Sequence, residues 1–579
     1  MNLSPNFAED LAPRGMGMLA PELAMQAEDE GGAFARYWDQ LRATGTPRDP
    51  RVQEAVAAFI GNKPAIAARL VSKVLARHPR NASALHVKAE LAKRAGKPEE
   101  AEKLFAKCVE IEPNCALYRF NYAVMLSRPK TAQRALALFD ELLEKDPGNL
   151  LYRAKKAELL VREEKHAEAA ECFQKLAEDF PDVADVHTGY AGVLRSLGRG
   201  DECVAALRRA VELLPTRGAI WWSLASLKTF RFTDDEVKQM EELSARSDLP
   251  HVDRVNLHYA LGTAYDLRKE YEKSYSHFAR GNAVRRIGMN YDADEITKLV
   301  SRARTMFTPE FFREREGLGC DSNAPIFMLG MQRAGSTLLE QILGSHPQIE
   351  PVGELQTILQ IVGENVIPKT KDLYPLGMEK LDAADYKAIG ERYLELVEKQ
   401  RKTDRPYFVD KCGYNFLHIG VLRLALPNAK ILDMRRHPLG CCYANFTVSF
   451  QYAPPLSYSQ SDIARFYADY VRLMAHFERV QPGVVHRVIY EHLVENLEGE
   501  VRTMLDFLGL PFEPACLEYY KTERVLSSFS SEQVRSPIFR EGLDRWKNYE
   551  PWLGQMKAAL GPVLDAWPDV PDFEALEAR

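Results

Sequence analysis

The sequence predicts two fold classes in one chain: an all-α array of helical repeats, followed by an α/β domain with a mainly parallel sheet. Two observations carry this prediction. Prolines recur every 34 residues through the first half of the chain, and an apolar segment that begins at Pro325 leads into a glycine-containing turn and a helical pattern. The length of 579 residues allows about three to four domains. Its 46% hydrophobic and 27% charged residues are typical of globular proteins.

Residues 1–50 show no clear period, and we expect them to form a leader or a capping segment before the repeats. They lack the basic and apolar regions of a secretory signal, and no apolar run reaches the roughly 18 residues of a membrane span. The nine cysteines include no C-x-x-C pair, which favours reduced thiols. We therefore expect a cytoplasmic protein that does not interact with membranes.

Residues 51–300 carry a repeat that is defined by two series of small residues and one of prolines. The series are Ala89, Ala123, Ala157, Ala191 and Ala225; Ala67, Ala101, Ala135, Ala169 and Cys203; and Pro79, Pro113, Pro147, Pro181 and Pro215. Small residues allow two antiparallel helices to cross closely, and proline ends a helix. The pattern resembles the tetratricopeptide repeat. Such arrays present a concave surface, so we expect a protein or peptide partner there.

A second motif follows the apolar strand that is predicted to end at Gly330, where a turn leads into a helix. Free backbone N–H groups at the start of a helix form a cradle for an anion. Compared with the P-loop pattern G-x4-G-K-[ST], Gly330 and Gly335 have the correct spacing, but Ser336 replaces the lysine. An ATP-dependent phosphotransferase normally needs that lysine and magnesium. The motif therefore disfavours a P-loop kinase, and it favours a less charged transferred group, with Arg333 as the cation and no metal.

The segment from Arg333 to Leu338 is similar to the 5′-phosphosulfate loop of sulfotransferases that use 3′-phosphoadenosine 5′-phosphosulfate (PAPS). The resemblance covers about residues 324–546, and it is nearest to tyrosylprotein sulfotransferases and to bacterial sulfotransferases fused to tetratricopeptide repeats. Gln332 replaces the usual proline of this loop. The resemblance implies a sulfotransferase domain over 318–555, followed by a C-terminal tail over 556–579. It also implies loop contacts to the donor by Arg333, Ala334, Gly335, Ser336 and Thr337, although Ala334 replaces the usual serine.

The same resemblance implies the residues that carry out the transfer. In the family, the base is a glutamate 21 residues after the loop arginine, which corresponds to Glu354. Lys411, which follows an apolar strand, matches the lysine that stabilises charge on the transferring group. Ser530 matches the serine that assists this lysine. His346 is the competing candidate for the base, since other sulfotransferases use histidine.

Further donor contacts are expected in the second half of this domain. Arg436 matches the arginine that binds the 3′-phosphate, but Ala444 stands where the family has a serine. Either 3′-phosphate affinity is reduced, or a neighbouring side chain replaces the serine. The candidates are Asn445, Thr447 and Ser449. The remaining contacts that the resemblance implies are Tyr490, Ser531 and Arg545, the last standing where the family has lysine.

These features together predict a PAPS-dependent sulfotransferase that acts on an acceptor hydroxyl, such as a peptide tyrosine presented by the repeats. The net charge of −6 gives no overall basic field for nucleic acid. The alternative function is a repeat scaffold whose nucleotide-binding domain has lost catalysis, because Ala334 and Ala444 depart from the family pattern.

Overall fold

The computed structural model describes residues 33–128, 131–227, 230–370, 374–449, 455–522, 536–538, 540 and 542–578, with side chains from residue 39 onward. Packing divides the chain into two compact units, and the boundary in the sequence falls between Leu224 and Ala225. The predicted site residues Ser530 and Ser531 lie outside the described residues. The predicted fold class is confirmed in both parts, since a helical array precedes an α/β part that contains a parallel sheet.

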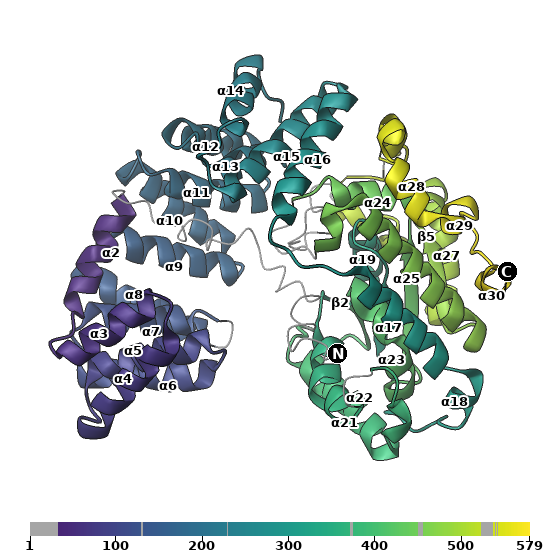
Figure 1. Cartoon of the computed structure of the whole chain (residues 1–579), viewed down its shortest axis with the longest axis horizontal. Coiled ribbons are helices and arrows are strands. Elements are labelled where there is room, and N and C mark those ends of the chain that lie inside the picture. Colours follow the sequence, from purple (N-terminus) through teal and green to yellow (C-terminus); the bar gives the residue numbers. More distant parts are fainter. Residues whose placement is uncertain are drawn as a thin grey trace. The chain divides into compact units, whose positions relative to one another are not determined.

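The first unit consists of helices that follow one another in pairs (Figure 1). Its helices are α2 (Ala33–Thr44), α3 (Pro50–Ile60), α4 (Pro64–Arg77), α5 (Ala82–Arg94), α6 (Pro98–Ile111), α7 (Ala116–Leu126), α8 (Ala132–Lys145), α9 (Leu150–Arg162), α10 (His166–Asp179), α11 (Ala184–Ser196), α12 (Gly200–Leu213) and α13 (Gly218–Ala225). The repeating prolines lie two residues beyond a helix end, as Pro113 follows α6 and Pro147 follows α8. Both helices end before the proline because its ring cannot continue the backbone hydrogen bonding.

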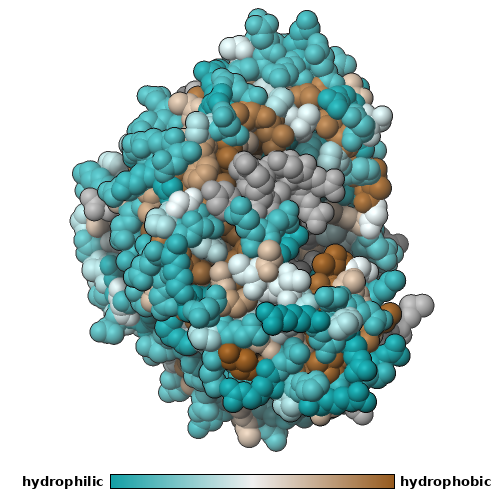
Figure 2. Space-filling view, turned by 90° about the vertical axis from the view of Figure 1, so that its left-hand side faces the viewer, coloured by the Kyte–Doolittle hydropathy of each residue, from teal (hydrophilic) through white to brown (hydrophobic). Residues whose placement is uncertain are grey.

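The repeated small residues lie at the contacts between helices. Ala89 and Ala123 are both 0% exposed, and the repeated aromatic residues Phe105 and Phe139 are equally buried. Figure 2 shows a largely hydrophilic face on which hydrophobic residues form small, separate groups. Most of the apolar surface of these helices is therefore used in packing between helices.

The second unit begins with five helices that precede the sheet. They are α14 (Asp234–Ser244), α15 (His251–Leu267), α16 (Tyr271–Arg286), α17 (Ala293–Met306) and α18 (Pro309–Arg313). The pair α15 and α16 keeps the packing of the repeat, because a Cβ added to Gly262 would approach the Phe278 ring to 2.7 Å. By packing, however, this pair belongs to the same compact unit as the sheet. The domain limits at residues 300 and 318 remain sequence-based predictions.

The sheet contains five strands that are all parallel, in the order β2-β3-β1-β4-β5. They are β1 (Pro325–Leu329), β2 (Ile349–Gly353), β3 (Tyr407–Asp410), β4 (Lys430–Arg435) and β5 (Val485–Ile489). The central strand β1 is buried along its whole length. From β1 the chain proceeds to β2 and β3 on one side, and then to β4 and β5 on the other. Such a reversal opens a crevice at the carboxyl ends of the strands.

Helices and short helical turns connect and cover these strands. They are α19 (Ser336–Gly344), α20 (Thr357–Ile361), η2 (Val362–Val366), α21 (Ile367–Thr370), η3 (Met378–Lys380), α22 (Ala383–Glu398), η4 (Gly413–His418), α23 (Ile419–Ala425), α24 (Pro438–Phe446), η5 (Pro455–Tyr458), α25 (Gln460–Val480), α26 (Tyr490–Glu495), α27 (Leu497–Leu508), η6 (Pro514–Cys516), η7 (Tyr519–Lys521), η9 (Arg545–Trp552), α28 (Gly554–Leu560), α29 (Pro562–Asp565) and α30 (Phe573–Glu577). Among the described helices, none combines the length and the apolar character that crossing a bilayer requires.

Candidate functional site

The predicted site residues gather at one edge of the sheet. Four of them directly follow the last residue of a parallel strand, while the glycine-containing loop follows β1. These four are Glu354 after β2, Lys411 after β3, Arg436 after β4 and Tyr490 after β5. Because the carboxyl ends of parallel strands share one edge, residues from distant parts of the sequence meet there.

The loop between β1 and α19 has a backbone that requires glycine at two positions. Gly330 and Gly335 have φ angles of 131° and 110°, and Arg333 also has a positive φ of 66°. An added Cβ would lie 2.3 Å from the Met434 carbonyl oxygen at Gly330, and 2.5 Å from the Tyr490 ring at Gly335. Helix α19 begins directly after Gly335, so its first backbone N–H groups are available to an anion in the loop.

Helix α24 holds this loop from the side. The Gln332 carbonyl accepts hydrogen bonds from Asn445 Nδ2 at 2.7 Å and from Cys441 Sγ at 3.3 Å. Asn445, a candidate replacement for the missing serine, is therefore used to fix the loop. Ser449, another candidate, is 8% exposed and hydrogen-bonds a side chain of α15. Ala334 is 1% exposed, so its methyl group is buried in the protein.

Positive charge concentrates beside the loop. Arg436 donates to the Arg333 carbonyl at 3.2 Å and to the Gly542 carbonyl at 2.6 Å, and its guanidinium lies 5.1 Å from the centre of the Tyr490 ring. Burial lowers the pKa of Arg333 to about 10, with the nearby Arg436 charge as the second cause and Arg545 as a smaller one. An anion bound here would relieve the repulsion between these cations.

The neighbouring arginine of β4 has a different function. Arg435 is 2% exposed and donates through Nε to Asp433 Oδ2 at 2.7 Å, while Asp433 also accepts from the Tyr470 hydroxyl. Burial alone would lower the pKa of Arg435, but the Asp433 carboxylate raises it above the ordinary value. Arg435 is thus a core ion-pair residue, which leaves Arg436 as the β4 arginine beside the loop.

The last predicted donor contact within the described residues, Arg545, lies at the start of η9. Its Nε donates to Asp266 Oδ1 at 3.3 Å, and its Nη2 also pairs with this carboxylate. Asp266 belongs to α15, 279 residues earlier in the chain. No sequence motif pointed to Asp266, because its place in the repeat resembles that of an ordinary surface residue.

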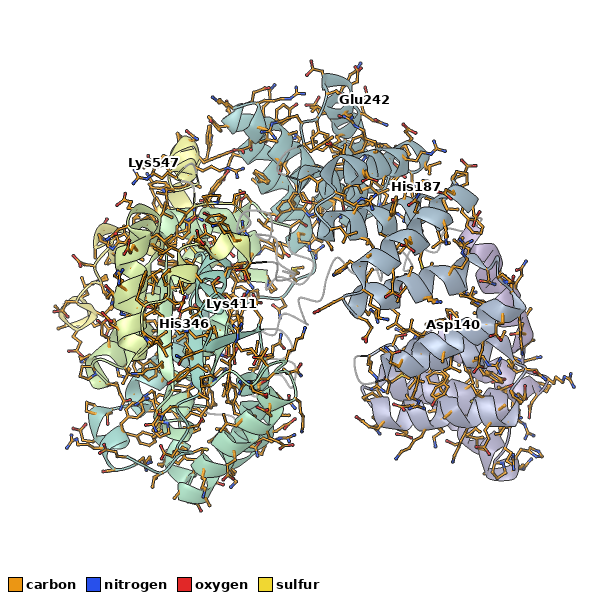
Figure 3. The ribbon with its side chains drawn as sticks, turned by 180° about the vertical axis from the view of Figure 1, so that it is seen from behind. Asp140, His187, Glu242, His346, Lys411 and Lys547 are labelled. Atoms are coloured by element: carbon orange, nitrogen blue, oxygen red, sulfur yellow. The ribbon has the colours of Figure 1, made fainter. Side chains whose placement is uncertain are left out.

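Lys411, which is labelled in Figure 3, forms the centre of a buried charge cluster. Its Nζ lies 3.0 Å from Glu354 Oε1 and 3.3 Å from Glu340 Oε2. The side chains of Lys411 and Glu340 are 7% and 4% exposed, whereas that of Glu354 is 32% exposed. Burial alone would lower the pKa of Lys411, but the two carboxylates raise it above the ordinary value, so the lysine stays charged.

Sequence reasoning missed Glu340, which lies on helix α19 directly after the loop. The sequence does contain an indication of this residue, because a single carboxylate interrupts the mainly apolar segment Leu338–Leu343. A charged residue on the buried face of a helix needs a partner of opposite charge. The sequence alone does not show that this partner is Lys411.

A cavity of about 200 Å³ opens beside this cluster. The residues that line it come from the loop, from η4 and from the segments after β2 and β3. They include Ser336, Glu354, Gln356, Lys411 and Tyr414. In the described part of the chain, no group of three or more His, Cys, Asp or Glu side chains is arranged to hold a metal ion.

His346, the competing candidate for the base, lies at the end of α19 and is 1% exposed. Its Nδ1 accepts from the Gln348 backbone N–H at 3.2 Å, and its Nε2 lies 3.1 Å from the Pro511 carbonyl, to which it donates. Both ring nitrogens therefore hold the backbone in place. This arrangement favours Glu354, which is partly exposed and borders the cavity.

Comparison with known proteins gives two family matches. Residues 325–514 match the model of the sulfotransferase family, and residues 52–114, 86–149 and 155–217 match the tetratricopeptide repeat. The chain thus contains both kinds of domain that its sequence predicts.

Two of the curated proteins that are similar in sequence illustrate the likeness. An "Uncharacterized protein" of Aquifex aeolicus is 31% identical over 65% of this chain and 50% of its own length. A "Putative protein-tyrosine sulfotransferase" of Caenorhabditis briggsae is 24% identical over 38% of this chain and 80% of its own length. The chain therefore spans about half the length of the Aquifex protein. Among solved structures, the sulfotransferase domain of the Synechococcus PCC 7002 olefin synthase is 21% identical, covering 39% of this chain and 88% of that domain with a TM-score of 0.30.

Proposed function

We propose that this chain, in which tetratricopeptide repeats precede a sulfotransferase-family domain, transfers a sulfuryl group from PAPS to an acceptor hydroxyl. The observation that carries the proposal is the pairing of Lys411 with the partly exposed Glu354, at a cavity that the loop also borders. A carboxylate and a buried cation at one cavity are the groups that such a transfer requires.

The residues around the loop fit the 5′ side of this donor. The left-handed turn at Gly335, together with the first N–H groups of α19, suits an oxygen-rich anion. Arg333 and Arg436 supply positive charge there, and Tyr490 packs beside Gly335. When bound, PAPS supplies an activated sulfuryl group whose leaving group is a phosphate. We assign Ser336 and Thr337 to the same loop contacts, and Ser530 and Ser531 keep the roles that the family resemblance implies.

The transfer needs one proton acceptor and one cation. In the proposed step, a bond forms between the acceptor oxygen and sulfur while the bond from sulfur to the phosphate oxygen breaks. Glu354 takes the proton of the acceptor hydroxyl, and Lys411 stabilises the charge that develops on the departing oxygen. Once Glu354 is neutral, Glu340 remains as the carboxylate partner of Lys411, 3.3 Å away. The buried lysine therefore keeps a counter-ion throughout the step.

We propose a peptide tyrosine as the acceptor. The cavity of about 200 Å³ has the size of a side chain, and is smaller than the roughly 300–1,000 Å³ of typical small-molecule sites. Tyr414 is among the residues that line it, and the tetratricopeptide repeats of the first unit are the kind of domain that binds peptides. The nine free cysteines are consistent with a reducing, cytoplasmic setting, which we include in this proposal.

The alternative is a repeat scaffold with a non-catalytic nucleotide-binding domain. One observation favours it: Ala334, which is almost fully buried, has a methyl group where the family serine would offer a hydroxyl to a phosphate. The Lys411 cluster favours catalysis instead, because two carboxylates around one buried lysine are costly to keep without a function.

Calorimetric titration of 3′-phosphoadenosine 5′-phosphate, the desulfated product, into the full-length protein without added metal tests the donor site. We expect micromolar binding by the wild type and its loss in Arg333→Ala. Arg80→Ala is the matched control, because Arg80 is an exposed arginine of the first unit. If the wild type does not bind, the proposal fails and the scaffold function is favoured. If it binds, tyrosine peptides and small phenols are then compared as acceptors of labelled sulfate.

A further inference from the structure

Asp266, near the carboxyl end of α15, links the helical pair α15 and α16 to the candidate donor site. Its side chain is 10% exposed and accepts from two residues of η9. Arg545 pairs with it through Nε and Nη2, and the Tyr549 hydroxyl donates to its Oδ1. Both oxygens of the carboxylate therefore bind one guanidinium, which is the strongest geometry for an ion pair of this kind.

Tyr549 extends this contact toward helix α24. It is 0% exposed, and its hydroxyl oxygen lies 2.9 Å from Ser274 Oγ of α16. Its ring centre lies 4.5 Å from that of Tyr443 on α24. The pair of helices α15 and α16 thus holds η9, and η9 in turn packs on α24.

Helix α24 is the element that fixes the phosphate loop, through Asn445 and Cys441 on the Gln332 carbonyl. The helical pair also contacts α24 directly, because Asn282 Nδ2 of α16 donates to the Phe446 carbonyl at 2.9 Å. This bond satisfies a carbonyl at the end of α24 that has no partner within the helix. Buried side-chain contacts thus run without a break from α15 to the loop.

The positive charges around the loop indicate what Asp266 contributes. The positive charges of Arg436 and Arg545 both lower the pKa of Arg333, so these cations repel one another in the absence of an anion. The Arg545 side chain is 49% exposed, so its orientation depends on the partner that holds it. The Asp266 carboxylate holds its Nε edge in place, so the cation is already positioned when an anion arrives, and less ordering is needed on binding.

We propose that Asp266 is a positioning residue for the donor site, and that it acts through Arg545 and Tyr549 of η9. This inference rests on the proposed function in naming PAPS as the donor. It makes the last repeat-like pair of helices, α15 and α16, a part of the transferase site.

Asp266→Asn in the full-length protein tests the proposal. Titration with 3′-phosphoadenosine 5′-phosphate is expected to show about tenfold weaker binding than in the wild type, because one charge-assisted pair is lost. In turnover assays the donor KM should rise while the acceptor KM stays unchanged. Asp266→Glu keeps the charge and should restore binding to within about threefold of the wild type.

Asp234→Asn is the matched control. Asp234 is an aspartate of α14 that pairs with Arg268 at 2.8 Å, but its side chain is 94% exposed. The same substitution there removes an exposed ion pair, and should leave donor affinity unchanged.

Amide hydrogen exchange without any ligand provides a readout that does not depend on the donor. Peptides covering residues 545–552 should exchange faster in Asp266→Asn than in the wild type, and at the wild-type rate in Asp234→Asn.

If the wild type fails to bind the nucleotide, the proposed function is wrong, while exchange still shows whether Asp266 orders η9. If the wild type binds but Asp266→Asn binds equally well or more tightly, Asp266 does not position the donor site. Unchanged exchange would likewise overturn the inference.

Discussion

Replacing Glu340 by glutamine, and comparing this variant with Glu354→Gln, tests the roles assigned to the two carboxylates of Lys411. The carboxylates lie at similar distances from the lysine Nζ, 3.3 and 3.0 Å, but their side chains are 4% and 32% exposed. Both substitutions remove one negative charge with almost no change in shape. The two variants should therefore differ for reasons of burial and chemistry alone.

The magnitude follows from the geometry. At 3.3 Å and an effective dielectric constant of about 20, the attraction between Lys411 and Glu340 is roughly 5 kcal/mol, and burial of the charges cancels a large part of it. Removing one partner of a buried pair typically costs about 3–5 kcal/mol, but here Glu354 still pairs with Lys411. We expect Glu340→Gln to lower the free energy of unfolding by about 2 kcal/mol. Because Glu354 is partly exposed, Glu354→Gln should lower the free energy of unfolding by less than about 1 kcal/mol.

Turnover should rank the two variants in the opposite order, with the larger loss of rate in Glu354→Gln. Glu354→Gln removes the proton acceptor, and should lower kcat by about 10²–10⁴-fold. Glu340→Gln leaves the acceptor in place, but it deprives Lys411 of a counter-ion once Glu354 is protonated. A decrease in kcat of about 10-fold to 100-fold is expected, which corresponds to roughly 1.4–2.7 kcal/mol.

The assays are thermal unfolding of both variants and single-turnover transfer from labelled PAPS to the best acceptor. The expected pattern is a clearly lower Tm for Glu340→Gln and a clearly lower rate for Glu354→Gln. If Glu354→Gln retains the wild-type rate, this residue is not the base. If the two variants lose equal stability, burial does not determine how much each carboxylate contributes to stability, and the reasoning is wrong.

Three further outcomes are expected. Gly335→Ala should abolish nucleotide binding, because its φ of 110° disfavours any side chain and the new Cβ would lie 2.5 Å from the Tyr490 ring; calorimetry checks this. Burial raises the pKa of Asp410 to about 7 from 3.8, so the protonated form favours folding and stability is lost as pH rises from about 4 to 7. This loss is on the order of 4 kcal/mol, and Asp410→Asn should remove it. Denaturant unfolding at a series of pH values measures it, and the same pH dependence in both proteins would contradict the assignment. His346→Gln should keep the transfer rate within about tenfold of the wild type, since both ring nitrogens bind backbone; a complete loss of turnover with an unchanged Tm would instead make His346 the base.

Much of the site was predictable because it lies in short segments whose local pattern carries the chemistry. Gly330 and Gly335 show a turn that only glycine can adopt, and Arg333 lies inside that turn. Lys411 and Arg436 each end an apolar segment of strand type, so their common edge in a parallel sheet followed directly.

The residues that sequence reasoning missed act through contacts between distant segments. Glu340 was visible as a charge in an apolar helix, but its partner Lys411 lies 71 residues away, directly after β3. Asp266 gave no signal, because its partner Arg545 is 279 residues away. Arg435 and Arg436 are adjacent in sequence, and only burial assigns one to the core and the other to the loop.

The sequence by itself determined the helical repeat, the parallel α/β fold and the strand–turn–helix loop, because each depends on a local period or on a backbone angle. The tertiary structure alone decided that α15 and α16 belong to the compact unit that contains the sheet, and not to the unit of the earlier repeats. It also decided which carboxylates face Lys411 and Arg545. The physical reason is that burial and charge pairing depend on distances in space, which a single sequence does not contain.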